Sequence, residues 1–262
     1  GPGKFNDASQ ISVHPQGNIF IADYDTGRLQ QFDPEGNFKQ MWRVEPDRNG
    51  NNYVSDLAGC FVDRIYVVRG GDILSYQAGE VFLVGSITGE FPETYFSGLA
   101  IDPSNRLYSL ARASIGDDLI QLKADGSLIR RVEDIIYAVD SSTPPQDDII
   151  AVDGLGNTYF LSVFEPQVYK YDIQGRYLDR FGSQGNQAGL LGNPTKLAVD
   201  SQGRIFVLDR DYIQVFDNSG GFLNALKWDY SLGTPRDIAI DIDGNLYVIT
   251  SKGQALKYRL NW

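Results

Sequence analysis

Four aspartates beside apolar, strand-like segments could give this chain metal chemistry. They are Asp23, Asp56, Asp209 and Asp237. Carboxylate oxygens are ligands that Ca²⁺ prefers, so these four residues are the candidates for a calcium site. The corresponding positions of the repeats described below are instead occupied by Arg69, Ala111, Ser162, Gly98 and Lys196. The sequence therefore predicts no prepared calcium cage, and no metal or other cofactor.

Cysteine and histidine chemistry is strongly limited, because the chain has one residue of each type. Cys60 can form neither an internal disulfide nor a thiolate cluster. His14 excludes any mechanism that needs two imidazoles in one chain. We expect Cys60 to be buried and inert, and His14 to cap a turn or to face solvent.

The overall charge narrows the classes of partner. The formal net charge is −11, which opposes binding to a phosphate backbone, so we expect no nucleic-acid partner. No apolar run approaches the roughly 18 residues of a membrane helix, so we expect no membrane insertion.

One Cys, one Met and abundant Tyr and Gly suit an extracellular or cell-surface domain, although a cytoplasmic protein can have the same composition.

One sequence unit occurs six times along the 262 residues. Small residues in the middle of an apolar triplet mark the copies, and successive markers lie 41 to 51 residues apart. The markers are Ser12, Ala58, Ala100, Ala151, Ala198 and Ala239. Eight positions after each marker stands an aromatic residue in every copy: Phe20, Tyr66, Tyr108, Tyr159, Phe206 and Tyr247. Repeats of this length that read as strands are typical of propellers.

Each unit contains four predicted strands separated by turns. Gly, Asn or Asp stands five positions after the marker, which suits a tight hairpin with a positive φ. The middle strands are apolar on both sides, as expected for sheets packed between other sheets. The predicted fold is therefore all-β, a six-bladed β-propeller of four-stranded antiparallel blades.

The segments "VHPQGNIFIADYDTGRLQQFDPEGNF" and "VDSQGRIFVLDRDYIQVFDNSGGF" resemble NHL repeats. The resemblance covers nearly the whole chain, is close in blades one, four, five and six, and is weak in blade two. It implies that residues 1–262 form a single NHL-type propeller domain. It also implies a module that binds protein, peptide, carbohydrate or RNA through one face.

Blade six ends in "KYRLNW", directly after its third predicted strand. Residues 1–9, "GPGKFNDAS", resemble the inter-blade loop "GLLGNPTK" and do not read as a fourth strand. We therefore expect three strands in blade six and an exposed sheet edge, in a domain cut from a longer protein.

The loops between second and third strands and the loops between blades share one face of the predicted fold, and they vary most in length. Variable loops on a rigid scaffold are where recognition is usually placed. We expect the binding site among the polar and aromatic residues of these loops, because Tyr and Arg are typical interface anchors. They are Asp23, Tyr24, Asp25, Asp56, Arg69, Tyr95, Arg112, Glu165, Lys196, Arg210, Asp211, Tyr212, Arg236 and Asp237. For each one taken singly, a solvated loop residue is the competing interpretation.

Asp102, Asp153, Asp200 and Asp241 recur at one turn position, where an Asp can accept hydrogen bonds from turn amides. We therefore expect a structural role for them. Arg64, Arg106 and Arg204 share a neighbouring turn position and are expected to be solvated.

Three functional classes remain open. The favoured prediction is a non-catalytic binding or sensor module, not an enzyme, that recognises a protein, peptide or glycan on the variable face and is monomeric as an isolated domain. The alternative is a Ca²⁺-dependent lactonase- or esterase-like propeller hydrolase. The third is a purely architectural platform in a larger protein.

Overall fold

The computed structural model describes residues 2–14, 17–24, 26–47, 49–59, 64–77, 80–85, 95–112, 116–136, 138–140 and 149–260. Cys60, and with it the prediction of a buried thiol, lies outside these residues. The described residues form six antiparallel sheets, of which five have four strands and one has three. The only helix among them is the short 3₁₀ helix η1 (Tyr230–Leu232). None of the described helical residues makes a segment long and apolar enough to cross a membrane.

Three sheets belong to one compact unit, Gly1–Pro92 with Asp229–Trp262. Blade one contains β1 (Ala8–Val13), β2 (Ile19–Asp23), β3 (Arg28–Phe32) and β4 (Phe38–Arg43). Blade two contains β5 (Asp56–Gly59), β6 (Arg64–Arg69), β7 (Asp72–Gln77) and β8 (Glu80–Gly85). Blade six contains β21 (Pro235–Ile240), β22 (Leu246–Thr250) and β23 (Ala255–Tyr258). The first strands β21 and β5 both pack against β1.

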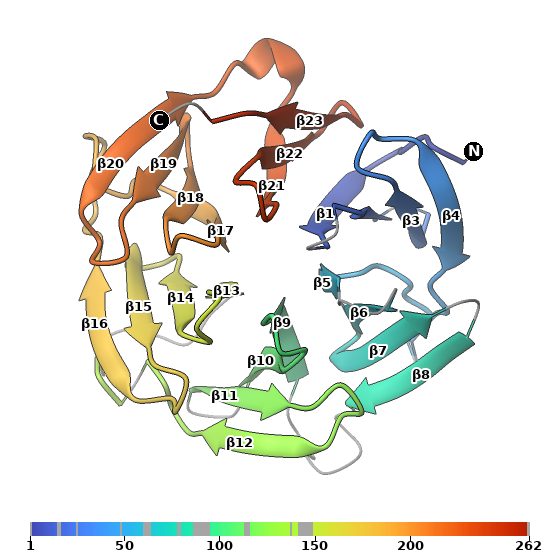
Figure 1. The fold of residues 1–262 in the computed structure, drawn as a ribbon, viewed down its shortest axis with the longest axis horizontal. Coiled ribbons are helices and arrows are strands. Elements are labelled where there is room, and N and C mark those ends of the chain that lie inside the picture. The colour runs from blue at the N-terminus through green and yellow to red at the C-terminus, as the bar shows by residue number, and fades with distance from the viewer. Residues whose placement is uncertain are drawn as a thin grey trace. The chain divides into compact units, whose positions relative to one another are not determined.

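The other three sheets form the second unit, Glu93–Trp228. Blade three contains β9 (Tyr95–Ile101), β10 (Leu107–Arg112), β11 (Asp117–Leu122) and β12 (Leu128–Val132). Blade four contains β13 (Ile149–Val152), β14 (Thr158–Ser162), β15 (Gln167–Tyr171) and β16 (Tyr177–Phe181). Blade five contains β17 (Pro194–Val199), β18 (Ile205–Asp209), β19 (Tyr212–Phe216) and β20 (Phe222–Lys227). Figure 1 shows these blades as successive sheets from green to orange, and β9 and β17 both pack against β13.

Burial falls from the middle of each blade to its fourth strand, as the sequence pattern predicts. All five residues of β2, β14, β18 and β22 are buried. The outer strand β12, "LIRRV", is exposed along most of its length. Middle strands covered on both sides need apolar side chains on both sides, and the outer strands can carry charge.

The chain is a six-bladed β-propeller. Its strands follow the predicted order in every blade, and blade six has three strands. The prediction of an exposed edge at β23 is therefore confirmed. The single-domain prediction for residues 1–262 stays a prediction.

The recurring turn aspartates have the predicted structural role. Asp102 is buried, and its carboxylate accepts hydrogen bonds from the amides of Ser104 (2.9 Å) and Arg106 (3.0 Å). It also accepts the Tyr108 hydroxyl at 3.0 Å. Burial raises the pKa of the Tyr108 phenol, and the neighbouring Asp102 charge raises it further, so Tyr108 stays protonated at neutral pH. The same carboxylate–tyrosine contact recurs as Asp153–Tyr159 and Asp241–Tyr247, at 3.1 Å in each pair.

Replacing a buried turn carboxylate should therefore destabilise the fold. Asp102→Ala leaves two turn amides without their acceptor and should lower the free energy of unfolding by about 2–3 kcal/mol. Asp33→Ala is the matched control, because Asp33 accepts the amides of Glu35 and Asn37 in an exposed turn. It should cost less than about 1 kcal/mol, since water can replace the lost bonds. Urea unfolding curves of the two variants give both values, and equal losses would contradict the structural role of burial at Asp102.

Candidate functional site

A two-residue hairpin joins β18 to β19 in blade five and carries charge at its tip. Asp209 and Tyr212 face each other across the hairpin, with Arg210 and Asp211 between them. Arg210 has a φ of 46°, in the left-handed region that glycine normally occupies. A side chain with a Cβ costs about 1–2 kcal/mol there. Backbone strain of this kind concentrates at functional sites.

The loop between blades four and five, residues 182–193, is held against this hairpin by two buried side chains. The Asp209 carboxylate accepts the amides of Gly192 at 3.0 Å and Asn193 at 2.6 Å. The Gln214 side chain donates to the Leu190 carbonyl at 2.6 Å and accepts the Gly189 amide at 2.9 Å. Gln214 also donates to Asp209 at 2.9 Å, which joins the two contacts into one network. We call this network the Asp–Gln clamp.

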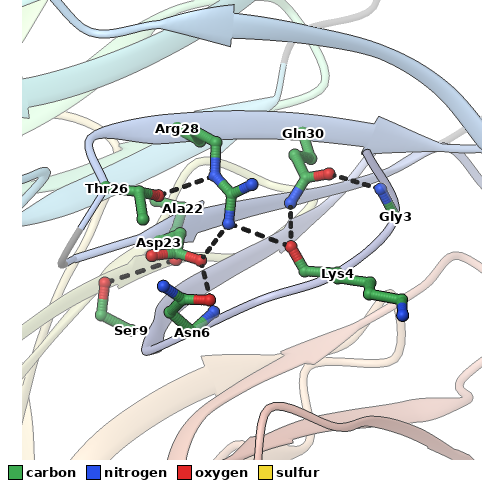
Figure 2. Close-up of polar contacts among 9 residues, drawn as sticks. All are labelled: Gly3, Lys4, Asn6, Ser9, Ala22, Asp23, Thr26, Arg28 and Gln30. Atoms are coloured by element: carbon green, nitrogen blue, oxygen red, sulfur yellow. Dashed lines mark hydrogen bonds and ion pairs between the residues drawn. The ribbon is translucent and has the colours of Figure 1, made fainter. Parts of the chain in front are cut away.

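Blade one has a related clamp, in which Arg28 and not the glutamine contacts the aspartate (Figure 2). Gln30 accepts the Gly3 amide at 2.8 Å and donates to the Lys4 carbonyl at 3.1 Å. Asp23 accepts the Asn6 amide at 2.7 Å. Residues 3–6 thus bind to blade one as residues 189–192 bind to blade five, which confirms the predicted likeness of the two segments.

An arginine reinforces the clamp of blade one. Arg28 lies 3.1 Å from the Asp23 carboxylate, and both side chains are buried. Burial alone would raise the pKa of Asp23, but hydrogen bonds from Asn6 and Thr26 and the Arg28 charge outweigh it, and the pKa is lowered. Because the pKa of Asp23 is lowered in the folded protein, its ionised carboxylate stabilises the fold. The full stabilisation is present above the unfolded-state pKa of about 3.9. That contribution is lost as the pH falls from there through the folded-state pKa.

The clamped loop and the hairpin of blade five enclose a pocket of about 320 Å³. Charged and amide side chains line it together with a few small apolar residues. The lining residues are Gly185, Asn186, Gln187, Ala188, Leu190, Gly192, Asp209, Arg210, Asp211, Tyr212, Gln214 and Ala225. An arginine, an aspartate and a tyrosine therefore lie at one pocket, where they can bind an anionic or carbonyl oxygen and exchange a proton.

A second hollow of about 470 Å³ also borders this loop. Its walls include Ile149, Val163 and Phe164, and Phe164 is 57% exposed. Gly192 lines both hollows. Residues of the loop 182–193 therefore line both hollows.

Of the predicted site residues in this unit, only Arg210, Asp211 and Tyr212 line the polar pocket. Tyr95 is exposed at the start of β9, and Glu165 is exposed in the turn between β14 and β15. Arg112 lies 3.9 Å from Asp117 at the end of β10. Lys196 pairs with Leu208 inside the sheet of blade five. The structure thus separates these four residues from the pocket.

The predicted residues of the other unit mostly support its loops. Asp237 accepts the Ile11 amide (2.8 Å), and Asp56 accepts the Leu57 amide (2.8 Å). Arg69 donates to the Pro46 carbonyl (3.2 Å), Arg236 lies 3.3 Å from Asp7, and Tyr24 packs on Tyr53 (5.3 Å between ring centroids). Asp23 belongs to the clamp of blade one. Asp25 lies outside the described residues.

Sequence reasoning missed the side chains that build the pocket wall. Asn186, Gln187 and Gln214 were not predicted, although they line it. The signal for Gln214 was present in the segment "IQVF", which blade one repeats as "LQQF". Only blades one and five have Gln two positions before the aromatic residue that ends the third strand, and these blades have the clamp.

Three of the four suspected calcium ligands have backbone partners. Asp23, Asp209 and Asp237 each accept at least one backbone amide from a neighbouring segment. Among the described residues, no group of three or more His, Cys, Asp or Glu side chains could hold a metal ion. Each of these three carboxylates therefore anchors a neighbouring backbone segment.

No protein-family model matches this chain, and no curated protein matches it in sequence. Solved structures match it over almost its whole length. A gluconolactonase from Xanthomonas campestris has 14% identity and a TM-score of 0.69, covering 95% of this chain and 85% of the other. Virginiamycin B lyase from Staphylococcus aureus, in a catalytically inactive form with quinupristin, has 13% identity and a TM-score of 0.63, covering 96% and 84%. Regucalcin from Agrobacterium tumefaciens, a calcium-binding protein, has 12% identity and a TM-score of 0.66, covering 96% and 84%.

These neighbours support the propeller fold and correct the functional prediction. The prediction of a non-catalytic binding module, and of a chain that is not an enzyme, is wrong, because propellers of this fold include a lactonase and a lyase. The hydrolase alternative agrees better with them. The prediction relied on the net charge and on the absence of an acidic cage in the sequence. Neither property separates a binding propeller from a catalytic one. The finer resemblance to NHL repeats has no family match behind it.

Replacing Arg210 with glycine tests whether the backbone is strained at this position. Arg210→Gly should raise the free energy of unfolding by about 0.5–1 kcal/mol, because glycine adopts a positive φ without a Cβ clash. Asn105→Gly is the matched control, since Asn105 has a φ of 60° but is a residue type that tolerates it, so its change should be smaller. Thermal unfolding of both variants measures the effect. A less stable Arg210→Gly protein would contradict strain at this position.

Proposed function

We propose that this chain is a propeller enzyme that cleaves an ester or a lactone in the pocket beside the β18–β19 hairpin. The observation that carries the proposal is the meeting of Arg210, Asp211 and Tyr212 at one clamped pocket, with Arg210 in a strained backbone conformation. The likeness to a gluconolactonase and to virginiamycin B lyase supports this class of chemistry.

Ester cleavage needs two kinds of group, and the pocket contains both. Negative charge develops on the carbonyl oxygen in the transition state, and a cation or hydrogen-bond donor must stabilise it. The Arg210 guanidinium can do this with several N–H donors. A base must activate the attacking water, and the Asp211 carboxylate is an acidic residue of the pocket that the clamp does not use. The Tyr212 hydroxyl can donate a proton or a hydrogen bond to the substrate.

Hydrolysis suits this chain better than a histidine-dependent elimination. The virginiamycin B lyase that resembles this chain is described as inactive when one histidine is changed to alanine. The only histidine here, His14, is buried at the end of β1 in blade one and does not line the pocket. The proposed reaction therefore uses carboxylate, guanidinium and hydroxyl groups.

We also propose a repeat type and a ligand class for this propeller. The clamp glutamines occupy the Gln position of the NHL-like third strand, which favours an NHL-type repeat in blades one and five. A carbohydrate-derived lactone would fit a glycan-type ligand on the variable loops. An extracellular or cell-surface location stays a prediction.

The experiment is a pH-stat assay of the purified chain with a panel of sugar lactones, aliphatic lactones and aryl esters. We expect turnover of at least one substrate, equal with Ca²⁺ and with EDTA because the proposed reaction uses the side chains of Arg210, Asp211 and Tyr212. Arg210→Ala and Asp211→Asn should each lower kcat/KM by about 100-fold or more.

Arg176→Ala is the control, because this exposed arginine pairs with Asp172 in a turn of blade four, away from the pocket. It should keep full activity. No turnover of any lactone or ester would contradict the proposal. Turnover that survives Arg210→Ala and Asp211→Asn would place the reaction elsewhere.

A further inference from the structure

The second hollow beside the loop of residues 182–193 is lined mostly by apolar side chains. Its volume of about 470 Å³ lies in the usual range of small-molecule sites. Its walls come from the β14–β15 turn and from the starts of β13 and β17, in the same unit as the polar pocket. The apolar residues in these walls are Ile149, Val163, Phe164, Pro166 and Pro194. We call this site the apolar hollow.

Phe164 gives the apolar hollow an aromatic surface that meets solvent. It stands in the β14–β15 turn and is 57% exposed. Apolar surface of this kind is stabilised when an apolar group of a ligand covers it. None of the described residues that line the hollow is acidic or basic. The apolar hollow therefore suits an uncharged, apolar part of a ligand.

The polar pocket and the apolar hollow meet at Gly192, which lines both. A Cβ atom at this position would lie 2.9 Å from Oδ1 of Asn186, 3.0 Å from the Gly185 carbonyl oxygen and 3.6 Å from Nε of Arg210. The missing side chain thus lets the Arg210 guanidinium lie close to the border. Asn193 lines the apolar hollow, and its carbonyl accepts the Arg210 amide at 3.4 Å. The proposed catalytic cation therefore stands where the two sites meet.

An ester bound at this border would extend in two directions. With its carbonyl oxygen at Arg210, one part of the ester would lie in the polar pocket and the other in the apolar hollow. Asn186, Gln187 and Tyr212 offer amide and hydroxyl groups in the polar pocket. These groups can form hydrogen bonds with hydroxyl groups of a substrate. A substrate that matches both sites has one hydroxylated part and one apolar part.

The available proton donors decide which part of the ester lies in which site. A leaving alcohol must receive a proton as its bond to the acyl carbon breaks. Asp211 and Tyr212 line the polar pocket, whereas the described lining of the apolar hollow has no titratable side chain. The alcohol part therefore belongs in the polar pocket, and the acid part belongs beside Phe164.

We propose that the substrate is an ester of a polyhydroxylated alcohol, such as a sugar, with an aromatic or branched aliphatic acid. This inference rests on the proposed hydrolysis. The oxygen of water bonds to the acyl carbon as Asp211 takes its proton, and the bond from that carbon to the alcohol oxygen breaks. Tyr212 gives the alcohol its proton, and the proton on Asp211 then returns to Tyr212. The products are the free acid and the free alcohol.

Two matched esters test the choice of acid. One is methyl glucoside with a 3-phenylpropanoyl group on O6, and the other has an acetyl group there. We expect kcat/KM to be about tenfold or more higher for the phenylpropanoyl ester, because one methylene in an apolar pocket can already give that factor. Phe164→Ala removes an aromatic contact and should lower this preference by about three- to tenfold. Phe164→Leu keeps apolar surface and should retain most of the preference.

Leu155→Ala is the matched control. Leu155 is also a large apolar residue of blade four and is 78% exposed, but it stands in the turn between β13 and β14 and lines neither site. Its replacement should leave the preference unchanged.

Binding of an uncharged probe separates the apolar hollow from the chemistry. By NMR, 3-phenylpropanamide should shift the backbone amides of Phe164 and Thr195, which line the hollow, and leave that of Leu155 in place. The shift at Thr195 should be lost in the Phe164→Ala protein.

Equal kcat/KM for the two esters would overturn this inference and leave the proposed hydrolysis standing. A preference that Phe164→Ala leaves unchanged, or probe shifts only at other residues, would do the same. Turnover of lactones but of neither ester would also overturn the inference alone. Turnover of no lactone and no ester would overturn the proposed function and the inference with it.

Discussion

The Asp–Gln clamp is the contact on which the candidate site depends. A loop of twelve residues between two blades brings many backbone donors and acceptors that no sheet satisfies, and buried ones need partners. Asp209, at the end of β18, and Gln214, in the middle of β19, supply partners to Gly189, Leu190, Gly192 and Asn193. The clamp therefore fixes the loop that lines the pocket together with the hairpin at Arg210.

Much of the fold could be predicted from the sequence, because the signals for it are local and repeated. The small marker residues, the aromatic residue eight positions later and the turn Asp all act within one hairpin, as Asp102 and Tyr108 show. The three strands of blade six followed from where the third-strand pattern stops.

The site was predictable only in part, because its contacts join residues far apart in the chain. The hairpin residues Arg210 to Tyr212 stood out as charged and aromatic residues beside a strand. The role of Gln214 did not, since it acts through loop atoms 24 and 25 residues away. For the same reason Asp209 looked like a metal ligand, whereas its carboxylate is engaged by two amides of a distant loop. Composition gave no means of telling a catalytic propeller from a binding one.

Hydrogen exchange of the loop amides tests the clamp most directly. By NMR, the amides of Gly189, Gly192 and Asn193 should exchange at least about tenfold more slowly than those of Asn186 and Gln187 in the same loop, which corresponds to about 1.4 kcal/mol of local stability. In a Gln214→Leu variant, the protection of Gly189 should be lost while the strands β18 and β19 keep theirs. Equal exchange along the whole loop in the unaltered protein would show that the clamp does not fix the pocket wall, and the account of the site would fail.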